Sequence, residues 1–286
     1  MKRECPKCNS LAPQHVRNGY FVRESGRIRV QRYRCLICKK EFSDATFQLR
    51  YRQRLRRVNG RIEKELISGA SLRRIALLLK INLKTVARKL EYLAHKARLE
   101  HKKRLKKLFP VCEIQFDDME TFEHTKMKPL SITIAVIKQR RLVLGAEVSS
   151  MPAKGLLARK SRKKYGPRKD ERKQGRTRLF QKISECVEER ALFESDENPH
   201  YTSHLKQHFP GCRHLQYKGR RGCVVGQGEL KAGGFDPLFS LNHTCAMLRY
   251  SISRLVRRTW VTTKRIDQLQ NHIDIYINYH NKVLVS

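Results

Sequence analysis

The chain has 286 residues, enough for two or three domains at roughly 100–200 residues each. Its 63 Lys and Arg residues outnumber 26 Asp and Glu residues, and the formal charge is +37. Such a surplus predicts a polyanionic partner and makes nucleic acid the leading candidate. Hydrophobic residues make up 40% of the chain, which excludes a disordered basic tail and indicates folded cores.

The apolar segments are short. One of the longest, Ile132–Ile137, is interrupted by a Thr and is too short for a transmembrane helix. The start of the chain, MKRECPKCNS, has no apolar segment of the signal-peptide kind. We therefore expect a cytoplasmic protein that neither spans a membrane nor is secreted.

Four of the nine cysteines form two Cys-x-x-Cys pairs with 26 residues between them, namely Cys5, Cys8, Cys35 and Cys38. This spacing is typical of a structural zinc site, in which four thiolates surround one tetrahedral ion. Disulfides are the alternative, but a cytosolic location disfavours them. The other five cysteines lie singly in apolar or mixed surroundings, which predicts small buried side chains.

The insert between the two pairs supports a zinc ribbon. It predicts two strands around a turn at Ser25-Gly26. The expected apolar positions of these strands are Tyr20, Val22, Ile28, Val30 and Tyr33.

A helix-turn-helix is expected after the ribbon. Helical spacing of apolar residues ends at Gly69, Ser71 is a candidate N-cap for a helix over 72–79, and Asn82 can cap the next. The second helix of such a motif enters the DNA major groove. The side chains expected to project from it are Lys84, Thr85, Arg88 and Lys89. An ordinary helical hairpin with a solvated charged face is the alternative.

From Cys112 onward the pattern changes to strands. CEIQFDD, PLSITIAVI and RLVLGAEVS predict a three-stranded antiparallel meander, and the very basic residues 151–175 predict a loop or arm on phosphates. The elements expected next are a helix (177–189), a strand (190–195), a helix (201–208), a strand (213–217) and a long helix from about Asp236. The order βββαβαβα is that of the RNase H-like fold.

The scarce acids lie where this fold places metal ligands. Nucleases and transposases of this fold have one carboxylate in the first strand, one after the fourth, and one on the following long helix. Asp117, with Asp118 beside it, ends the expected first strand, and Asp196 ends the fourth. Two cations about 3.5–4 Å apart must share such ligands around one phosphate, and oxygen ligands select Mg²⁺ or Mn²⁺. A turn or cap role is the alternative for any single Asp.

The ribbon, the helix-turn-helix and the segment FDDMETF together resemble small bacterial insertion-sequence transposases of the DDE class. LRYSISRLVRRTWVTTK is similar to the Arg-rich helix that follows the last catalytic acid in that family. The resemblance extends over nearly the whole chain. It implies that Asp117 and Asp196 are the first two metal ligands, that two or more copies assemble on DNA, and that the protein associates with the bacterial nucleoid.

The third ligand departs from the family pattern. Counting back from Arg249 and Arg254, the family's Glu position falls on Asn242, a neutral residue. Glu229, 33 residues after Asp196, is the next candidate, and Asp236 is the third or else a helix cap. His243, beside Asn242, is a candidate for a bond to phosphate or to a metal-bound water, although a structural role is the more common one.

We therefore expect a multidomain α/β chain with a zinc ribbon (1–48), a helix-turn-helix domain with a basic connector (49–108) and an RNase H-like catalytic domain (109–286). Four arginines near the last catalytic helix are expected to contact the DNA backbone, namely Arg249, Arg254, Arg257 and Arg258. A solvated basic face is the alternative. The expected function is DNA transposition. A DNA-binding regulator derived from a transposase, and an RNA- or ribosome-associated zinc protein, are the alternatives.

Overall fold

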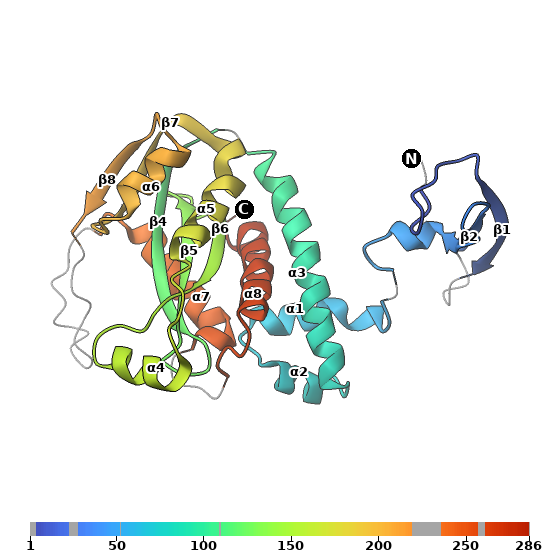
Figure 1. Ribbon diagram of the computed structural model, residues 1–286, viewed down its shortest axis with the longest axis horizontal. Coiled ribbons are helices and arrows are strands. Elements are labelled where there is room, and N and C mark those ends of the chain that lie inside the picture. Colours follow the sequence, from blue (N-terminus) through green and yellow to red (C-terminus); the bar gives the residue numbers. More distant parts are fainter. Residues whose placement is uncertain are drawn as a thin grey trace. The chain divides into compact units, whose positions relative to one another are not determined.

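A computed structural model describes residues 4–22, 28–51, 53–108, 110–218, 236–256 and 261–285 (Figure 1). The chain forms two compact units, Met1–Arg57 and Val58–Ser286. Among the described helices, none combines membrane-spanning length with sufficient apolar character.

The first unit is a small three-stranded antiparallel sheet in the order β1-β2-β3. The expected strands are β1 (His15–Val22) and β2 (Arg29–Cys35), and a third, β3 (Glu41–Ser43), was not predicted. Its core is formed by two of the cysteines predicted to bind zinc, Cys5 and Cys35, and by two aromatic rings, those of Tyr33 and Phe42. The expected turn at Ser25-Gly26 lies outside the described residues.

Of the five apolar positions expected in the ribbon, only two are buried. Val30 and Tyr33 are enclosed, whereas the side chains of Tyr20, Val22 and Ile28 are about half exposed. Apolar residues do alternate along the strands, but only one face of this small sheet is covered, so some of them remain exposed to solvent. A unit with so small a core depends on other bonds for its stability.

The second unit begins with three helices, α1 (Asn59–Ile67), α2 (Leu72–Leu78) and α3 (Leu83–Leu105). The predicted caps are confirmed, because the Ser71 hydroxyl accepts a hydrogen bond from the backbone N–H of Arg74 and Asn82 accepts one from that of Lys84. Between them Lys80 has φ +51°, the left-handed conformation that closes the turn. Two helices joined by a tight turn are thus present at the predicted place.

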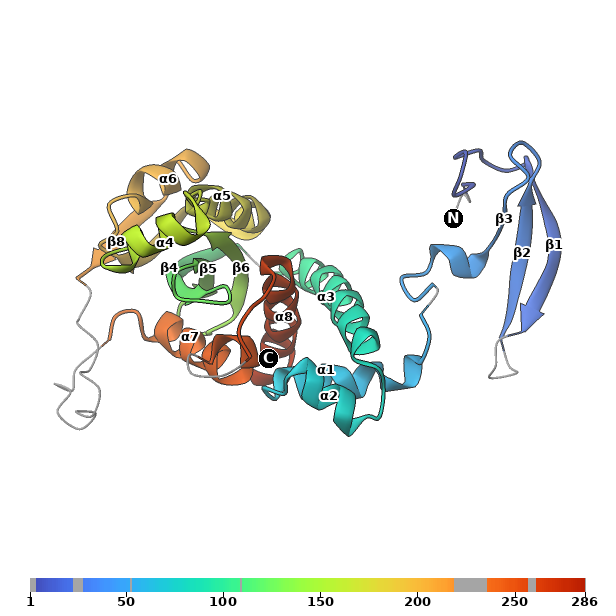
Figure 2. The ribbon, with the colours of Figure 1, turned by 60° about the horizontal axis from the view of Figure 1, so that its bottom comes forward.

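Helix α3 also packs along α8 (Ile266–Tyr279), the last helix of the chain, and the two lie side by side in Figures 1 and 2. Arg98 donates to Asp274 at 2.7 Å and to Asn271 at 2.9 Å across this contact. The buried His272 of α8 hydrogen-bonds to the carbonyl oxygen of Leu66 at the end of α1. The three helices therefore belong to the same compact unit as the sheet.

The remainder of the second unit is built on a five-stranded mixed sheet in the order β6-β5-β4-β7-β8. The pairs β4/β5 and β5/β6 are antiparallel, and β4/β7 and β7/β8 are parallel. Its strands are β4 (Val111–Phe122), β5 (Pro129–Ile137), β6 (Val143–Ser150), β7 (Val187–Asp196) and β8 (Arg213–Tyr217). This mixed α/β topology is compatible with the predicted RNase H-like fold.

Helices cover both faces of this sheet (Figure 2). On one face α5 (Arg172–Ile183) and α6 (Tyr201–His208) pack on even-numbered residues of β4, among them Ile114 and Phe116. On the other face α7 (Phe239–Ser251) and α8 pack on Met119 and on the apolar residues of β5. Alternate residues of β4 therefore face two different helix layers.

Several predictions about element bounds are wrong. The helix expected over 177–189 is α5, which ends at Ile183, and β7 begins at Val187. Strand β4 continues past Asp117 to Phe122, because pairing with β5 extends as far as Phe122 and Pro129. Residues 151–175 are not a plain loop, since they contain α4 (Leu157–Tyr165) and the start of α5. The Arg-rich helix ends at Ser251 and is followed by a short 3₁₀ turn, Ser253–Leu255.

Candidate functional site

The four predicted zinc ligands come together in the first unit. The sulfur atoms of Cys5, Cys8, Cys35 and Cys38 all lie within 4.8 Å of one another. The Cys5 and Cys38 sulfurs are 3.5 Å apart, and those of Cys8 and Cys35 are 3.6 Å apart. Four thiols at this separation fit one tetrahedral zinc ion, so the cluster can bind zinc.

Ser10 supports this cluster and was not predicted. Its hydroxyl lies 3.2 Å from both the Cys8 and the Cys35 sulfur atoms and 3.1 Å from the Nε2 atom of His15. Its hydrogen bonds lower the pKa of Cys8 and lower that of Cys35 to about 5. A lowered thiol pKa favours the thiolate, the form that binds metal.

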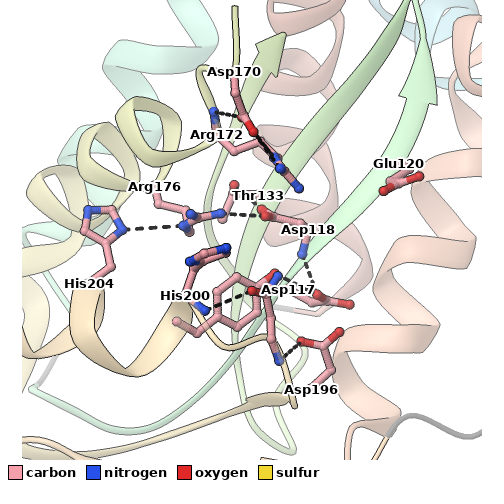
Figure 3. Close-up of polar contacts among 12 residues, drawn as sticks. Asp117, Asp118, Glu120, Thr133, Asp170, Arg172, Arg176, Asp196, His200 and His204 are labelled. Carbon is pink, nitrogen blue, oxygen red and sulfur yellow. Dashed lines mark hydrogen bonds and ion pairs between the residues drawn. The ribbon is translucent and has the colours of Figure 1, made fainter. Parts of the chain in front are cut away.

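The two predicted carboxylates also meet. In the parallel pair β4/β7, Gln115 lies opposite Glu194, so two residues further along each strand Asp117 lies level with Asp196. Because side chains alternate along a strand, both carboxylates project from the face of the sheet that α7 covers. Figure 3 shows the two side chains next to each other at the end of β7.

The pKa of Asp117 reports this proximity. Burial raises it to about 6, and the negative charge of Asp196 adds to the effect. Hydrogen bonds from the Asp118 backbone N–H at 2.6 Å and the Tyr201 hydroxyl at 3.0 Å act in the opposite direction. Burial also raises the pKa of Asp196. A pair of close carboxylates with raised pKa values is typical of a metal or catalytic site.

Tyr201, at the start of α6, is a further residue of this site. Its ring is 1% exposed, and burial together with the surrounding carboxylates raises its pKa, which keeps the hydroxyl protonated as a donor to Asp117. It lies in the predicted segment FESDENPHY, but no pattern in the sequence marks it, because its contact spans 84 positions.

Asp118 takes part in a different set of contacts on the opposite face of β4. It accepts a hydrogen bond from Arg176 of α5 at 2.8 Å and another from the Thr133 hydroxyl. Arg176 in turn donates to His204, as Figure 3 shows, and burial lowers the pKa of His204 to about 4. Asp118 is therefore held in a buried ion pair and directed away from α7.

A buried hydrogen-bond network holds α7, and it lies two residues before the carboxylates on each of their strands. Gln115, 1% exposed, donates to Glu194 at 2.8 Å and to the carbonyl oxygen of Pro237 at 2.7 Å, and accepts from the Leu241 backbone N–H. Glu194 also accepts from Lys138 at 2.7 Å and from Tyr217 at 2.9 Å. These bonds tie the start of α7 to the two strands that carry Asp117 and Asp196.

The structure describes two of the three candidates for the third ligand, Asn242 and Asp236, and they contact each other. The exposed Asn242 donates to Asp236 at 2.9 Å, and Asp236 also accepts from the Leu238 backbone N–H, but the N-cap residue of α7 is Leu238 rather than the candidate Asp236. Glu229 lies outside the described residues. In the described ranges, the four ribbon cysteines are the one group of three or more His, Cys, Asp or Glu ligand atoms this close together.

The side chain of α7 that experiences the charge of Asp117 is Cys245. Burial raises the pKa of its thiol to about 12, and the Asp117 carboxylate adds to the shift. Cys245 was predicted as core, and it does contact the apolar cluster between the sheet and α7. It lies about one turn beyond Asn242 on the helix.

The predicted DNA-contacting residues differ in their accessibility. Lys84 and Arg88 of α3 are exposed and Thr85 is half-buried. The expectation that Lys89 projects outward is wrong, since its side chain is 3% exposed.

Arg249 is half-buried, and burial lowers the pKa of Arg254, whereas Arg257 and Arg258 lie outside the described residues. His243 is half-buried with Arg141 at 3.3 Å.

The basic segment 151–175 is attached by ion pairs to β4 and to the residue that follows this strand. Lys154 lies 2.9 Å from Glu120, and Arg168 lies 3.1 Å from Glu123. Helix α4 within it is held by the Ser161 hydroxyl, which donates to the carbonyl oxygen of Met127. Its exposed cations are Arg159, Lys160, Arg162, Lys163 and Lys164.

Comparison with known proteins gives one kind of likeness. No protein-family model matches the chain, and no curated protein matches it. Among solved structures, the catalytic domain of Mos1 mariner transposase matches at 14% identity and a TM-score of 0.26. That match covers 68% of this chain and 88% of the transposase domain.

Proposed function

We propose that this protein is a DNA transposase of an insertion sequence, which binds the inverted repeats at the element's ends and catalyses metal-dependent strand cleavage and transfer. The observation that carries the proposal is the carboxylate pair. Asp117 and Asp196 lie 79 positions apart in sequence, yet the strand register brings them level on one face, and burial together with the charge of Asp196 raises the pKa of Asp117. A pair of this kind in a chain of charge +37 is best explained by bound cations.

The donor set fits Mg²⁺ or Mn²⁺, because carboxylate oxygens are the ligands these ions prefer. When bound, such ions activate a water or a 3′-hydroxyl and stabilise the leaving oxygen of a phosphodiester. Asp117 and Asp196 would hold them. Tyr201 keeps one oxygen of Asp117 engaged at 3.0 Å, which orients the other oxygen, and Gln115 holds α7 over the pair.

DNA recognition is assigned to the ribbon and the helix-turn-helix. The exposed Lys84 and Arg88 lie on the helix that enters the groove in such motifs. Arg249 remains a candidate contact, together with the basic cluster of α4. Joining two element ends requires two or more copies of the chain, and binding to chromosomal DNA would place the protein in the bacterial nucleoid.

A cleavage assay tests the proposal. The full chain is incubated with double-stranded DNA that carries the element's ends, with Mg²⁺ or Mn²⁺, and nicked products are measured. Asp117→Asn and Asp196→Asn should each reduce the rate at least about 10³-fold, since each removes a metal ligand. Asp267→Asn, which changes an exposed ion-paired acid, is the matched control and should leave the rate unchanged. Cleavage that survives both substitutions contradicts the proposal.

A second candidate function is a sequence-specific DNA-binding regulator derived from a transposase. The bond between Asn242 and Asp236 favours it, because a neutral side chain engaged elsewhere supplies no third carboxylate. The two candidates differ in one result. The regulator binds DNA with unchanged affinity after Asp117→Asn and cleaves none, with or without Mn²⁺.

A further inference from the structure

The carboxylate of Asp117 receives two hydrogen bonds, and both reach the same oxygen atom. The backbone N–H of Asp118 donates to Oδ1 at 2.6 Å, and the Tyr201 hydroxyl donates to Oδ1 at 3.0 Å. One donor belongs to the strand that carries Asp117 and the other to α6. Two donors that converge on Oδ1 fix the plane of the carboxylate and direct Oδ2 toward a ligand.

Arg176 of α5 contacts both residues that supply these hydrogen bonds. Its guanidinium donates to the Asp118 carboxylate at 2.8 Å, and the guanidinium carbon lies 5.3 Å from the centre of the Tyr201 ring. The Asp118 side chain faces α5, but its backbone N–H belongs to the strand itself and reaches Asp117 (Figure 3). Arg176 can therefore act on Asp117 across the sheet through these two neighbours.

Arg176 is itself oriented by His204 of α6. The Nε atom of Arg176 donates to Nδ1 of His204 at 3.4 Å, and Nε2 of His204 lies 3.0 Å from the Thr177 hydroxyl. Burial lowers the pKa of His204 to about 4, so its ring is neutral at neutral pH. Because Nδ1 accepts, Nε2 carries the proton and donates to Thr177. The guanidinium, in a residue that is 5% exposed, is thus held from two sides.

Stability alone does not explain this ion pair. The side chains of Arg176 and Asp118 are 6% and 9% exposed, so both charges have lost most of their hydration. The cost of that desolvation offsets the attraction, and apolar residues in place of a buried ion pair are often equally stabilising. What an apolar pair would not supply is the orientation that the guanidinium gives to its neighbours.

We infer that Arg176 is a positioning residue of the metal site, which fixes the backbone of Asp118 and the ring of Tyr201 and thereby aims Oδ2 of Asp117 at a divalent cation. The inference rests on the proposed function. Residues that orient a metal ligand change metal affinity about 10- to 100-fold when they are replaced. No motif marks Arg176 in the sequence, because its contacts span 25 or more positions.

The test removes the ion pair without leaving a buried charge. Arg176→Met alone would strand the Asp118 carboxylate, so the double variant Arg176→Met/Asp118→Asn is compared with Asp118→Asn, whose amide can still accept from Thr133. Before Mn²⁺ is added, the backbone amide proton at position 118 reports the bond to Asp117, and it should move upfield in the double variant. The Mn²⁺ affinity of the full chain, measured by electron paramagnetic resonance with zinc supplied to the ribbon, should fall about tenfold. Arg176→Lys, which keeps the charge, should retain most of it.

The matched control makes the same change at another ion pair of α5. Arg178 lies 3.0 Å from Glu147, and Arg178→Met/Glu147→Gln should leave the amide proton and the Mn²⁺ affinity as in the wild type. An equal loss in this control, or equal Mn²⁺ affinity in the double variant and Asp118→Asn, overturns the inference. If the amide proton shifts as expected but the wild type binds no Mn²⁺ and cleaves no DNA, the proposed function alone is contradicted. If the wild type cleaves DNA and loss of Arg176 changes neither measurement, the inference alone is contradicted.

Discussion

The ribbon and the carboxylate site are both candidate metal sites, but they are built in opposite ways. The four cysteines lie within one short segment, in a unit whose core contains two aromatic rings besides the cysteines themselves. The carboxylates lie on a five-stranded sheet between two apolar layers, and hydrogen bonds hold their surroundings. The difference predicts that the fold of the first unit depends on a bound metal ion, whereas the carboxylate site is positioned by the fold of the second unit.

The largest effect should follow from removing the ribbon's metal. Chelation, or Cys35→Ser, should unfold the first unit completely, because structural zinc contributes on the order of 10 kcal/mol to folding in such small domains. Limited proteolysis with mass spectrometry measures this, and the second unit should remain intact. Cys112→Ser changes an exposed cysteine outside the cluster and should have no effect. A ribbon that still resists proteolysis without metal would contradict the expectation that the first unit depends on a metal ion for its fold.

The carboxylate site should instead depend on buried hydrogen bonds. Gln115→Leu keeps the size of the side chain but removes the hydrogen bonds that Gln115 makes to one oxygen of Glu194, to the Pro237 carbonyl oxygen and to the Leu241 backbone N–H. We expect the free energy of unfolding of the second unit to fall by about 3 kcal/mol. Urea denaturation measures it, with the exposed Gln181→Leu as control. A loss similar to that of the control would show that packing alone holds α7.

Asp117→Asn should stabilise the second unit at neutral pH. A carboxyl whose folded pKa of about 6 exceeds its usual 3.8 favours folding below pH 3.8, and that stability is lost as pH rises through 6. The neutral amide removes this penalty, so we expect a gain of about 2–3 kcal/mol at pH 7.5. Urea unfolding should show the gain shrinking as pH falls toward 4. Asp267→Asn should show no gain, and a destabilised Asp117→Asn variant at pH 7.5 would falsify the raised pKa of Asp117.

Tyr201→Phe should have the smallest effect. The ring contacts with Phe116 at 4.9 Å and Arg176 at 5.3 Å remain, and one hydrogen bond to Asp117 is lost. We expect a loss of about 1 kcal/mol in stability and a further rise in the pKa of Asp117. NMR titration of the Asp117 carboxyl carbon measures the pKa directly. A pKa that stays at the wild-type value removes Tyr201 from the site and leaves it a core residue.

What the sequence predicts well is local. The spacing of Cys5, Cys8, Cys35 and Cys38 defines a site formed by two short loops, and Ser71 and Asn82 cap helices that begin next to them. The bounds of α6 and β8 agree with the prediction, because turn residues flank both elements. In each case the determining contacts lie within a few positions along the chain.

What the sequence does not predict depends on strand pairing and packing. Strand β4 is longer than its apolar pattern because β5 pairs with its polar end. Gln115 and Tyr201 carry no motif, and their roles arise from contacts 79 and 84 positions away. Lys89 has the spacing of an exposed residue, but the way the helices pack encloses it.

Helix α3 has 23 residues and is therefore about 34 Å long, close to one turn of B-DNA. One end carries the exposed Lys84 and Arg88, and the other leads within a few residues into β4, the strand of Asp117. Helix α8 packs along the side of α3. In a transposase built this way, the bond that is cut would lie at a fixed offset from the sequence that is read, and lengthening α3 by one turn would move the cut.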